Sequence, residues 1–554
     1  MRAPHLALVP ALILASASAW AAPSQQAQVD ALFAQWNRPN TPGAAVEVIK
    51  DGKVVYRRSF GMADIEQGRA ITPSTSFHVA SLSKQFTAFA ILLLAQEGKL
   101  SLDDDMHKYL PDLPDFGQTI RIRHLIAHTS GLRDQWNLLS MAGWRMDDVI
   151  TDDDVMRLVR RQRALNFTPG SDHSYCNTGY TLLGAIVQVV SGKSLAQFSK
   201  ERIFEPLGMK RTAFRENYSH LVAGRAQSYQ PSAGGGYEGV ALSYSTVGAT
   251  SLVTTLDDLA LWARNFDDAR VGGKQVLAQM QTAGTLNDGS AIEYGAGIGI
   301  SRYRGLRKID HSGSDAGFRS YLGRFPDQNL TIIVVGNGAD VQAPRLGFRI
   351  ADIYLKGQLE PLQKPVPNYS GSTEVGSDAR QLDSLTGTFK LDNGSAVTFA
   401  KEQGRLVGWT AGDDKMLFYR MGEREYFAKL GNASFRFDPP NADGVIEGGT
   451  WSRNTRSTHG KRIAPQPDAN LKSLEGEYYS DELHVLYTVS VKDGKAVLSY
   501  SRGDVELAPF EQNSFVGPWP FGLVKFTCAA PNGCTGFTVT ESRASDVQFS
   551  RVAR

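Results

Sequence analysis

The sequence predicts an α/β domain, with an antiparallel sheet and a largely helical insertion, followed by two small antiparallel β-barrels. Strand and helix patterns alternate up to about residue 356, whereas only short strand patterns and turns follow after about residue 380. A short motif also recurs within this second half. With 554 residues, 42% of them hydrophobic, the chain is long enough to build several buried cores.

The first half reads as one domain, residues 22–356, whose sheet takes strands from both of its ends. Residues 44–49 and 53–58 have strand patterns and flank the turn Asp51-Gly52, which predicts a hairpin. Residues 81–97 are nearly all apolar and end at Gly98, which is typical of a buried helix. We expect further helices at 152–163, 178–191, 194–204 and 257–265, strands at 307–310, 318–325 and 330–335, and a closing helix at 346–356.

The second half begins with a stretch rich in Pro, Ser and Gly, residues 357–381, which we interpret as a linker. The motif Leu382-x-x-Leu385-x-Gly387-x-Phe389 then recurs 89 positions later as Leu471-x-x-Leu474-x-Gly476-x-Tyr478. Each copy has about the length of one small barrel. The motif therefore predicts β-barrel domains at 382–465 and 466–554, with one fused β-domain as the alternative.

The N-terminus has the pattern of a cleaved secretory signal. One positive charge at Arg2 precedes a short apolar run, and Ala19-Trp20-Ala21 forms a cleavage site, so residues 1–21 are expected to be removed. The alternative is an N-terminal core helix. A signal peptide implies a periplasmic or secreted protein, and an oxidising compartment favours a disulfide between Cys528 and Cys534 across Pro531-Asn532-Gly533 over two reduced thiols.

The overall charge limits the choice of partners. Lys and Arg number 59 and Asp and Glu 57, which leaves a net charge of +2 and no basic surface for nucleic acid. No cysteine directly follows the cleavage site and no later segment is apolar for the ~18 residues of a span, so we expect no membrane anchor. The expected partner is a small-molecule or peptide substrate, for example one derived from peptidoglycan.

Ser81-Leu82-Ser83-Lys84, at the start of the apolar helix, is the first candidate for catalysis. Residues three apart share a helix face, so the Ser81 hydroxyl and the Lys84 ammonium can meet at the helix N-terminus. Serine becomes a strong nucleophile when a base takes its proton, and lysine can be that base. The alternative is an N-cap serine followed by a solvated lysine.

Two further elements complete the candidate site. In Tyr175-Cys176-Asn177, a positive charge on Lys84 would lower the pKa of the Tyr175 phenol, which could then exchange a proton with Ser81. At the end of a predicted strand, Gly313 of His311-Ser312-Gly313 would let a substrate lie close to the backbone. The alternatives are an aromatic anchor and a surface histidine. None of the three elements requires a metal or a cofactor.

The order of these elements resembles that of the serine β-lactamase and D,D-peptidase superfamily, the penicillin-recognising enzymes. In that superfamily S-x-x-K is paired with a tyrosine or serine motif and a K-T-G strand. The chain is similar to the branch with Y-x-N, and two further stretches match it: 125–132 (LIAHTSGL) and 167–180 (FTPGSDHSYCNTGY). The resemblance covers residues from about 40 to 356 and implies a β-lactamase/transpeptidase-like domain.

The resemblance also assigns roles to the residues. It implies that Ser81 is the nucleophile, Lys84 its activator and Tyr175 the general base and acid. Asn177, His311, Gly313 and Ser314 would bind substrate, with the N–H groups of Ser81 and Ser314 as the oxyanion hole. The three-domain plan resembles the D-aminopeptidases, in which one barrel reaches towards the active site.

His311 is where the chain departs from the β-lactamases, which usually have lysine there. A histidine is mostly uncharged at neutral pH, so we expect neutral amides or esters to be better substrates than carboxylates. The sequence therefore predicts an exported serine hydrolase that forms an acyl-enzyme, D-aminopeptidase-like or esterase-like. The alternatives are a D,D-carboxypeptidase or β-lactamase, a Cys176 nucleophile, and a non-catalytic peptidoglycan-binding or sensor protein. His124 and His128 have zinc-ligand spacing without an intervening glutamate, which favours a structural His128.

Overall fold

The structure is a computed structural model. It describes residues 23–553 apart from 233, 362–378, 411–414, 429–432, 454–455, 464–470, 512 and 530–532. The expected signal peptide, residues 1–21, most of the expected linker, and Pro531 and Asn532 of the expected turn lie outside the described residues. Signal peptide and linker therefore stay predictions.

A six-stranded antiparallel sheet is the centre of the N-terminal domain, with the strand order β12-β13-β14-β15-β1-β2. Its strands are β1 (Ala44–Lys50), β2 (Lys53–Phe60), β12 (Gly299–Tyr303), β13 (Leu306–Asp315), β14 (Phe318–Phe325) and β15 (Leu330–Gly336). Asp51 and Gly52 both have positive φ in the hairpin turn between β1 and β2. Because β1 pairs with β15, the sheet joins both ends of the domain, as the sequence predicts.

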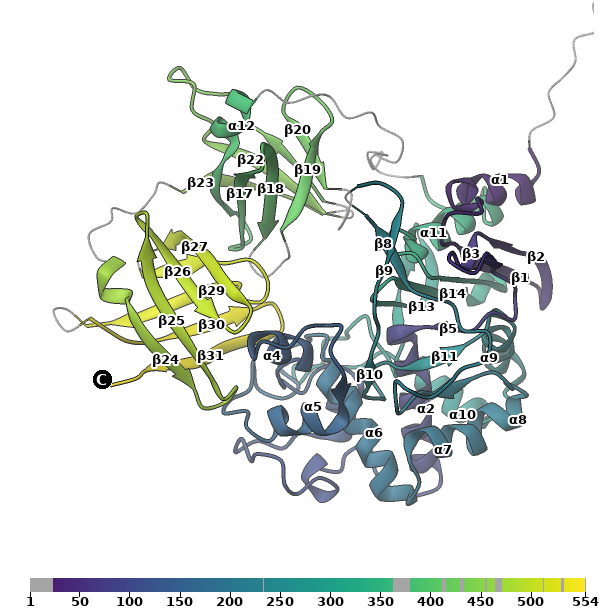
Figure 1. The fold of residues 1–554 in the computed structure, drawn as a ribbon. Coiled ribbons are helices and arrows are strands. Elements are labelled where there is room, and N and C mark those ends of the chain that lie inside the picture. The colour runs from purple at the N-terminus through teal and green to yellow at the C-terminus, as the bar shows by residue number, and fades with distance from the viewer. Residues whose placement is uncertain are drawn as a thin grey trace, which may run out of the picture.

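Hydrophobic cores cover both faces of this sheet. Val46 and Val48 of β1 face a cluster that includes α1 (Gln25–Leu32) and α11 (Ala343–Tyr354), while the alternate residue Ala45 faces the larger core. That larger core is built around α2 (Ser83–Gln96), in which every side chain from Ser83 to Leu94 is buried. The terminal helices therefore cover one face and the inserted helices the other (Figure 1).

The insertion between β2 and β12 consists of helices and very short strands. Its further α-helices are α3 (Ile122–Ile126), α4 (Gln135–Met141), α5 (Asp152–Val159), α6 (Asn177–Ser191), α7 (Leu195–Ser199), α8 (Glu205–Leu207), α9 (Leu256–Asp268) and α10 (Gly273–Met280). Its short strands are β3 (Met62–Asp64), β4 (Arg69–Ala70), β5 (Phe77–His78), β6 (Ile150–Thr151), β7 (Ala213–Phe214), β8 (Tyr229–Pro231), β9 (Tyr237–Gly239), β10 (Tyr244–Ser245) and β11 (Leu252–Thr254). The largely helical insertion is thus confirmed.

Two closed eight-stranded β-barrels follow. After α12 (Ala379–Leu385), the first barrel contains β16 (Gly387–Leu391), β17 (Ala396–Glu402), β18 (Arg405–Thr410), β19 (Met416–Arg420), β20 (Glu425–Ala428), β21 (Ala433–Phe437), β22 (Gly448–Arg453) and β23 (Arg456–Arg462). The second contains β24 (Gly476–Ser480), β25 (Val485–Lys492), β26 (Lys495–Tyr500), β27 (Gly503–Glu511), β28 (Ser514–Val516), β29 (Leu523–Cys528), β30 (Cys534–Glu541) and β31 (Ala544–Arg551). The repeated glycines, Gly387 and Gly476, begin the first strand of each barrel, so two barrels are confirmed over one fused domain.

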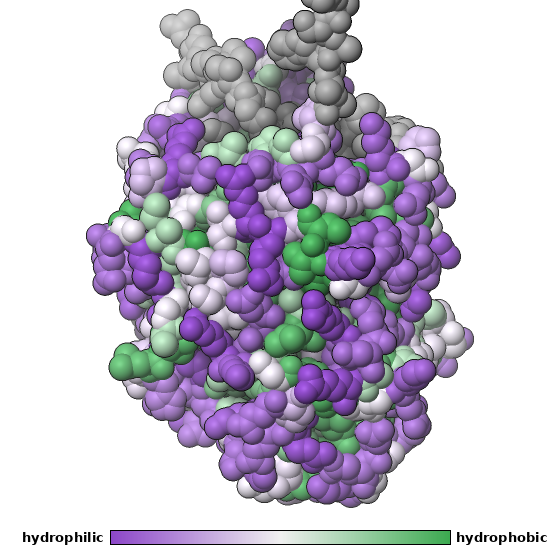
Figure 2. Space-filling view, turned by 90° about the vertical axis from the view of Figure 1, so that its right-hand side faces the viewer, coloured by the Kyte–Doolittle hydropathy of each residue, from purple (hydrophilic) through white to green (hydrophobic). Residues whose placement is uncertain are grey.

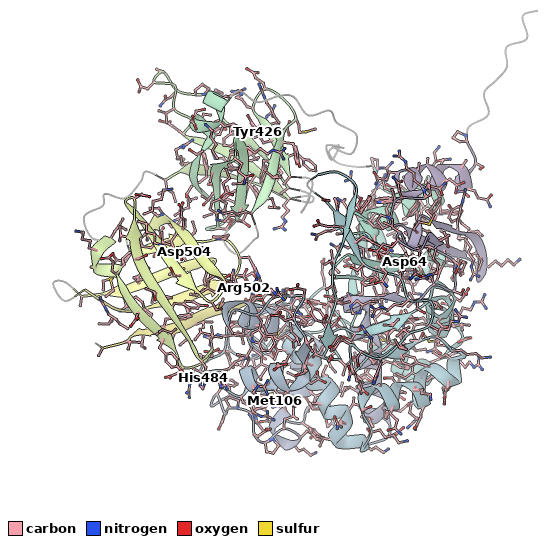
Figure 3. The ribbon with its side chains drawn as sticks, viewed as in Figure 1. Asp64, Met106, Tyr426, His484, Arg502 and Asp504 are labelled. Atoms are coloured by element: carbon pink, nitrogen blue, oxygen red, sulfur yellow. A yellow bond between two sulfur atoms is a disulfide. The ribbon has the colours of Figure 1, made fainter. Side chains whose placement is uncertain are left out.

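The second barrel is bound tightly to the N-terminal domain. Buried residues of this barrel belong to the same hydrophobic cluster as the helices of the insertion. Arg133 and Glu482 form an ion pair across the boundary, and each side chain is only 2% exposed. The Tyr487 hydroxyl donates to the Met141 carbonyl at the end of α4, beside which the second barrel lies in Figure 1. Arg502, in the β26–β27 turn, also lies on the side facing this domain (Figure 3).

Two further features bear on the sequence predictions. Cys528 and Cys534 form the expected disulfide, whereas Cys176 is a buried free thiol. The face shown in Figure 2 is mostly hydrophilic, with apolar residues in small separate areas. Among the helices in the described ranges, none has both the length and the apolar character needed to cross a membrane.

Candidate active site

Ser81 and Lys84 meet as the S-x-x-K spacing predicts. Ser81 lies in a single 3-10 turn, Ala80–Leu82, that leads directly into α2. The Lys84 Nζ atom is 3.1 Å from Ser81 Oγ, 2.8 Å from Asn177 Oδ1 and 2.7 Å from the Ala249 carbonyl oxygen. Ala80, next to Ser81, has a left-handed φ of 49°, a backbone strain that is common at functional sites.

Lys84 has the properties of a general base. Complete burial lowers its pKa to about 7, although the carboxylates of Asp315 and Asp134 oppose this shift. A large fraction of the side chain is then neutral at physiological pH. A neutral amine has two N–H groups, enough for Asn177 Oδ1 and the Ala249 carbonyl, and its lone pair is left for the Ser81 hydroxyl proton.

Tyr175 lies beside this pair, but its expected ionisation is wrong. Its ring centre is 4.9 Å from Lys84 Nζ, yet burial raises the pKa of the phenol, and the Ser81 hydroxyl and the Arg543 guanidinium lower it only in part. A positive charge on Lys84 was expected to lower the pKa of the phenol, but desolvation of the phenol has the larger effect. Tyr175 therefore stays protonated, which suits it to donate a proton or a hydrogen bond. Its buried hydroxyl is close enough to the Ser81 hydroxyl to interact with it, but within the described residues it completes no hydrogen bond of ordinary length.

Asn177 is fixed by a carboxylate that the sequence reasoning missed. Asp134 Oδ2 accepts from the backbone N of Asn177 at 2.6 Å and from its Nδ2 at 2.8 Å, while Oδ1 accepts from Trp136 N. The Asn177 amide oxygen is thereby turned towards Lys84. Asp134 is fully buried at the N-terminus of α4, where N-cap residues are commonly acidic. The sequence signal that could have identified Asp134 is its position directly before the helical stretch of α4.

His311 lies on the expected strand, but it has neither a positive charge nor a free ring nitrogen with which to bind a substrate. Burial lowers its pKa to about 3, so the imidazole is neutral. Nδ1 donates to the Ser312 carbonyl at 2.7 Å, and Nε2 then accepts from the Tyr294 hydroxyl at 3.0 Å. Both ring nitrogens are therefore engaged within the protein, which the sequence did not reveal because Tyr294 precedes the motif by a whole strand.

Gly313 lets two backbone segments of the protein come close together, while its expected contact with substrate stays a prediction. A Cβ atom at this position would lie 2.2 Å from the Val79 carbonyl oxygen and 3.0 Å from Ser81 N. The missing side chain lets β13 pack against the turn that carries Ser81. The Ser81 N–H is consequently held beside the strand edge that continues to Ser314, as an oxyanion hole requires. Beyond Asp310, β12 no longer pairs with this edge, and Ser312 and Ser314 are exposed.

Charged residues from distant segments border the site, and the sequence reasoning missed them. Asp315, at the end of β13, is bonded to His78 Nε2 at 2.8 Å and to the Thr250 hydroxyl at 2.5 Å. Arg543, from the turn between β30 and β31, lies with its Cζ 5.9 Å from the centre of the Tyr175 ring. No local pattern marks either residue, because tertiary packing alone brings them to Ser81.

The alternative residues have structural surroundings. Burial raises the pKa of the Cys176 thiol to about 12, and its Sγ atom is 3.3 Å from the Leu132 carbonyl oxygen, so it is a poor nucleophile. His128 Nδ1 accepts from Cys176 N, and its ring packs 4.2 Å from that of Tyr175. His124 Nδ1 accepts from Arg121 N at the start of α3. Among the residues with described positions, no metal-binding group of three ligands occurs.

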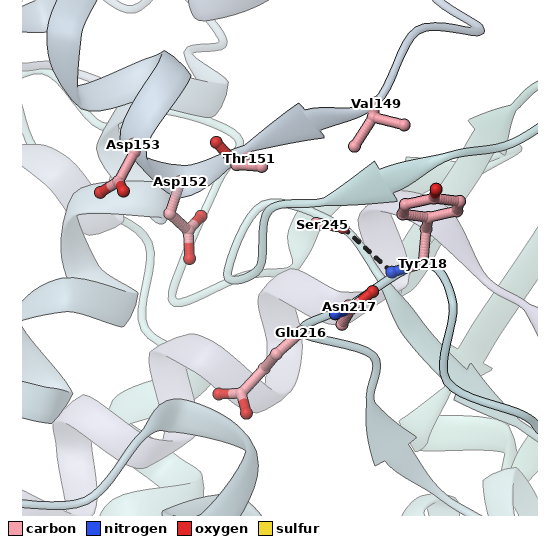
Figure 4. Close-up of a pocket in the computed structure, with 8 residues that line it drawn as sticks. All are labelled: Val149, Thr151, Asp152, Asp153, Glu216, Asn217, Tyr218 and Ser245. Atoms are coloured by element: carbon pink, nitrogen blue, oxygen red, sulfur yellow. Dashed lines mark hydrogen bonds between the residues drawn. The ribbon is translucent and has the colours of Figure 1, made fainter.

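A separate concave region of about 370 Å³ lies at the start of α5 (Figure 4). The residues that line it are Val149, Thr151, Asp152, Asp153, Glu216, Asn217, Tyr218 and Ser245, and none of the candidate catalytic residues is among them. The Asp152 carboxylate there accepts from the Thr246 hydroxyl and from Val247 N. Its hydrogen bonds are those of a structural side chain, so the residues around Ser81 remain the candidate active site.

Two D-aminopeptidases are similar to this chain in amino-acid sequence. A D-aminopeptidase of Brucella anthropi is 30% identical over 314 residues, which are 57% of this chain and 59% of that protein. A D-aminopeptidase of Gluconobacter oxydans is 30% identical over 296 residues, 53% of this chain and 56% of that protein. The matched segments therefore span less than two thirds of either relative.

Solved structures share the fold. The octameric penicillin-binding protein homologue from Pyrococcus abyssi superposes with a TM-score of 0.54 at 22% identity, covering 86% of this chain and 98% of that one. The D-amino acid amidase from Ochrobactrum anthropi SV3 superposes with a TM-score of 0.50 at 24% identity, covering 60% and 98%. The model of the Beta-lactamase family matches residues 29–355, more than half of the chain. The chain therefore belongs to the Beta-lactamase family.

Proposed function

We propose that this chain is a serine hydrolase that forms an acyl-enzyme on Ser81. The observation that carries the proposal is the fully buried Lys84, whose amine lies 3.1 Å from Ser81 Oγ with a pKa lowered to about 7. A buried lysine with this geometry is a competent base for a serine nucleophile. A binding or sensor protein would have no need for such a lysine.

In the proposed reaction, Ser81 Oγ attacks the substrate carbonyl carbon while its proton passes to Lys84 Nζ. The N–H groups of Ser81 and Ser314 stabilise the tetrahedral oxyanion. Tyr175, protonated because burial raises its pKa, donates a proton to the leaving group and recovers one from Lys84. A water molecule then attacks the acyl-enzyme with Lys84 as base, which releases the acid and regenerates the Ser81 hydroxyl.

The substrates that we propose are amides or peptides, with D-amino acid amides as the first to test. The D-aminopeptidases among the relatives support this choice, and the proposed mechanism also serves esters. We further propose that the protein acts in the periplasm or the medium, since residues 1–21 have the pattern of a secretory signal. The processed N-terminus of protein purified from its host would test that location.

A fluorophosphonate probe tests the reaction class directly. We expect the probe to label wild-type protein and Cys176→Ala, and to leave Ser81→Ala unlabelled. Hydrolysis of D-alanine p-nitroanilide and of nitrophenyl butyrate should follow the same pattern, and comparison with the L-enantiomer of the anilide gives the stereochemical preference. Equal losses in the two variants would revive the cysteine nucleophile, and an unlabelled wild type would favour a non-catalytic binding protein.

A further inference from the structure

We propose that Arg543 binds a carboxylate of the substrate, so that the second barrel selects what the N-terminal domain hydrolyses. The proposal rests on the proposed function, since it names the substrate class of that same site. It also replaces the expectation of a neutral substrate, which was based on His311 alone.

The position of Arg543 is set by its backbone. Ser542 and Arg543 form the turn between β30 and β31. The Arg543 carbonyl accepts from Asp134 N at 2.9 Å and from Asn166 Nδ2 at 3.0 Å, and Ser545 N donates to Asn166 Oδ1 at 2.8 Å. These bonds hold the turn beside the candidate site without using the arginine side chain.

The Arg543 guanidinium lies in the candidate site, and its N–H groups are available to bind another molecule. It lies over the Tyr175 ring, its side chain is 31% exposed, and its Nη1 is 3.6 Å from Asp134 Oδ2, outside hydrogen-bond distance. Within the ranges that the structure describes, it makes no hydrogen bond. Asp134 already accepts three hydrogen bonds, from both nitrogens of Asn177 and from Trp136 N. The ion pair therefore holds the guanidinium in place and leaves its fork of N–H groups for another acceptor.

A carboxylate is the ligand that fits this fork. Arginine binds carboxylates through two parallel hydrogen bonds, and such charge-assisted bonds are about twice as strong as neutral ones. On the strand side of the site, His311 is neutral and both of its nitrogens are bonded. Arg543, beside Tyr175 and Asp134, therefore supplies a positive charge that His311 does not. The Asp315 side chain, which is 15% exposed, is the competing charged group near the site. Its carboxylate would instead favour a substrate with an ammonium group.

The test compares two pairs of substrates, and in each pair one member has a carboxylate that the other lacks. N-succinyl- and N-acetyl-D-alanine p-nitroanilide place the carboxylate on the acyl side, and D-alanyl-D-alanine and its amide place it on the leaving group. We expect kcat/KM for the carboxylate member of at least one pair to be about tenfold higher in the wild type. Arg543→Gln should abolish that ratio, and Arg543→Lys should retain part of it.

Arg502→Gln is the matched control, because it removes the same charge from another exposed turn of the same barrel. It should leave the ratios unchanged, and using ratios cancels general losses of stability or base catalysis. A ratio that Arg543→Gln does not alter, or a preference for free-amine D-alanine p-nitroanilide over the succinyl compound, would overturn the carboxylate proposal alone. No turnover of any substrate, together with no fluorophosphonate labelling, would overturn the proposed function as well.

Discussion

The two barrels have the same closed eight-stranded architecture but different relations to the rest of the chain. The first has a hydrophobic core of its own, formed by residues between Leu382 and Trp451. The core of the second is continuous with that of the N-terminal domain. The first meets the second through a small cluster of Ala396, Phe510 and Val516. Two barrels of the same fold therefore differ in their attachment to the N-terminal domain, and the buried contact residues, rather than the fold, make that difference.

The largest expected effect comes from breaking the buried ion pair of the second barrel. Arg133→Met leaves the Glu482 carboxylate buried without its partner, which should cost about 3–5 kcal/mol of unfolding free energy. Hydrolytic activity should fall as well, because the turn with Arg543 loses its support. Denaturant unfolding and kcat/KM measure the two effects. The double variant Arg133→Met/Glu482→Met should recover part of the stability, and equal stability of single and double variants would contradict this account.

The disulfide should stabilise only the second barrel. Cys528 and Cys534 are six positions apart, and a loop this short gives roughly 2–3 kcal/mol at most by the chain-entropy relation. Replacing both by serine in a Cys176→Ala background should lower the unfolding free energy by that amount. Hydrogen exchange should increase in β29 and β30 and stay unchanged in the first barrel. Faster exchange in both barrels would mean that they unfold as one unit.

Variants in the two barrels should also differ in the pH dependence of kcat/KM. Because the neutral form of Lys84 is the base, kcat/KM should rise with pH through about 7. The Arg543 cation helps to lower the pKa of Lys84, so Arg543→Gln should move the midpoint upward, by less than about one pH unit. A first-barrel variant, Lys390→Gln, should leave it in place. A midpoint that falls in Arg543→Gln would have the wrong sign for this electrostatic effect.

The smallest effect is expected where the two barrels meet. Lys390 and Glu511 form an ion pair with side chains that are 48% and 54% exposed, so Lys390→Gln should cost less than about 1 kcal/mol. Activity should not change, since neither residue contacts the active site. Thermal unfolding and kcat/KM in low and high salt are the measurements. A loss as large as that of Arg133→Met would show that the first barrel is also essential to docking.

The features that the sequence predicts are local or periodic ones. Ser81 and Lys84 lie three residues apart at one helix start, so their contact follows from helix geometry. The motif repeat predicts two barrels because it places Gly387 and Gly476 at the same position of each. The central strands β1 and β15 are mostly apolar and bounded by turn residues, as a buried sheet requires.

The remaining features depend on burial and on long-range packing. The protonation of Tyr175 reverses the prediction because desolvation outweighs the neighbouring charge, and residue spacing carries no information on burial. His311 Nε2 is already bonded because Tyr294 lies beside it. Arg543 reaches the candidate site because a separate barrel docks there. Neither contact has a sequence pattern of its own.

The way in which the Arg543 turn is attached has a consequence for how substrate choice can change. Its docking bonds use the main-chain carbonyl of Arg543 and the amide of Ser545, which any amino acid other than proline at position 545 can provide. The side chain at position 543 thus takes no part in these docking hydrogen bonds, although its charge acts on Asp134 and Lys84. A single codon in a hairpin turn can then retune selectivity while the nucleophile and its base keep their geometry. Saturation mutagenesis of position 543 offers a compact library for redirecting the enzyme to new acyl groups.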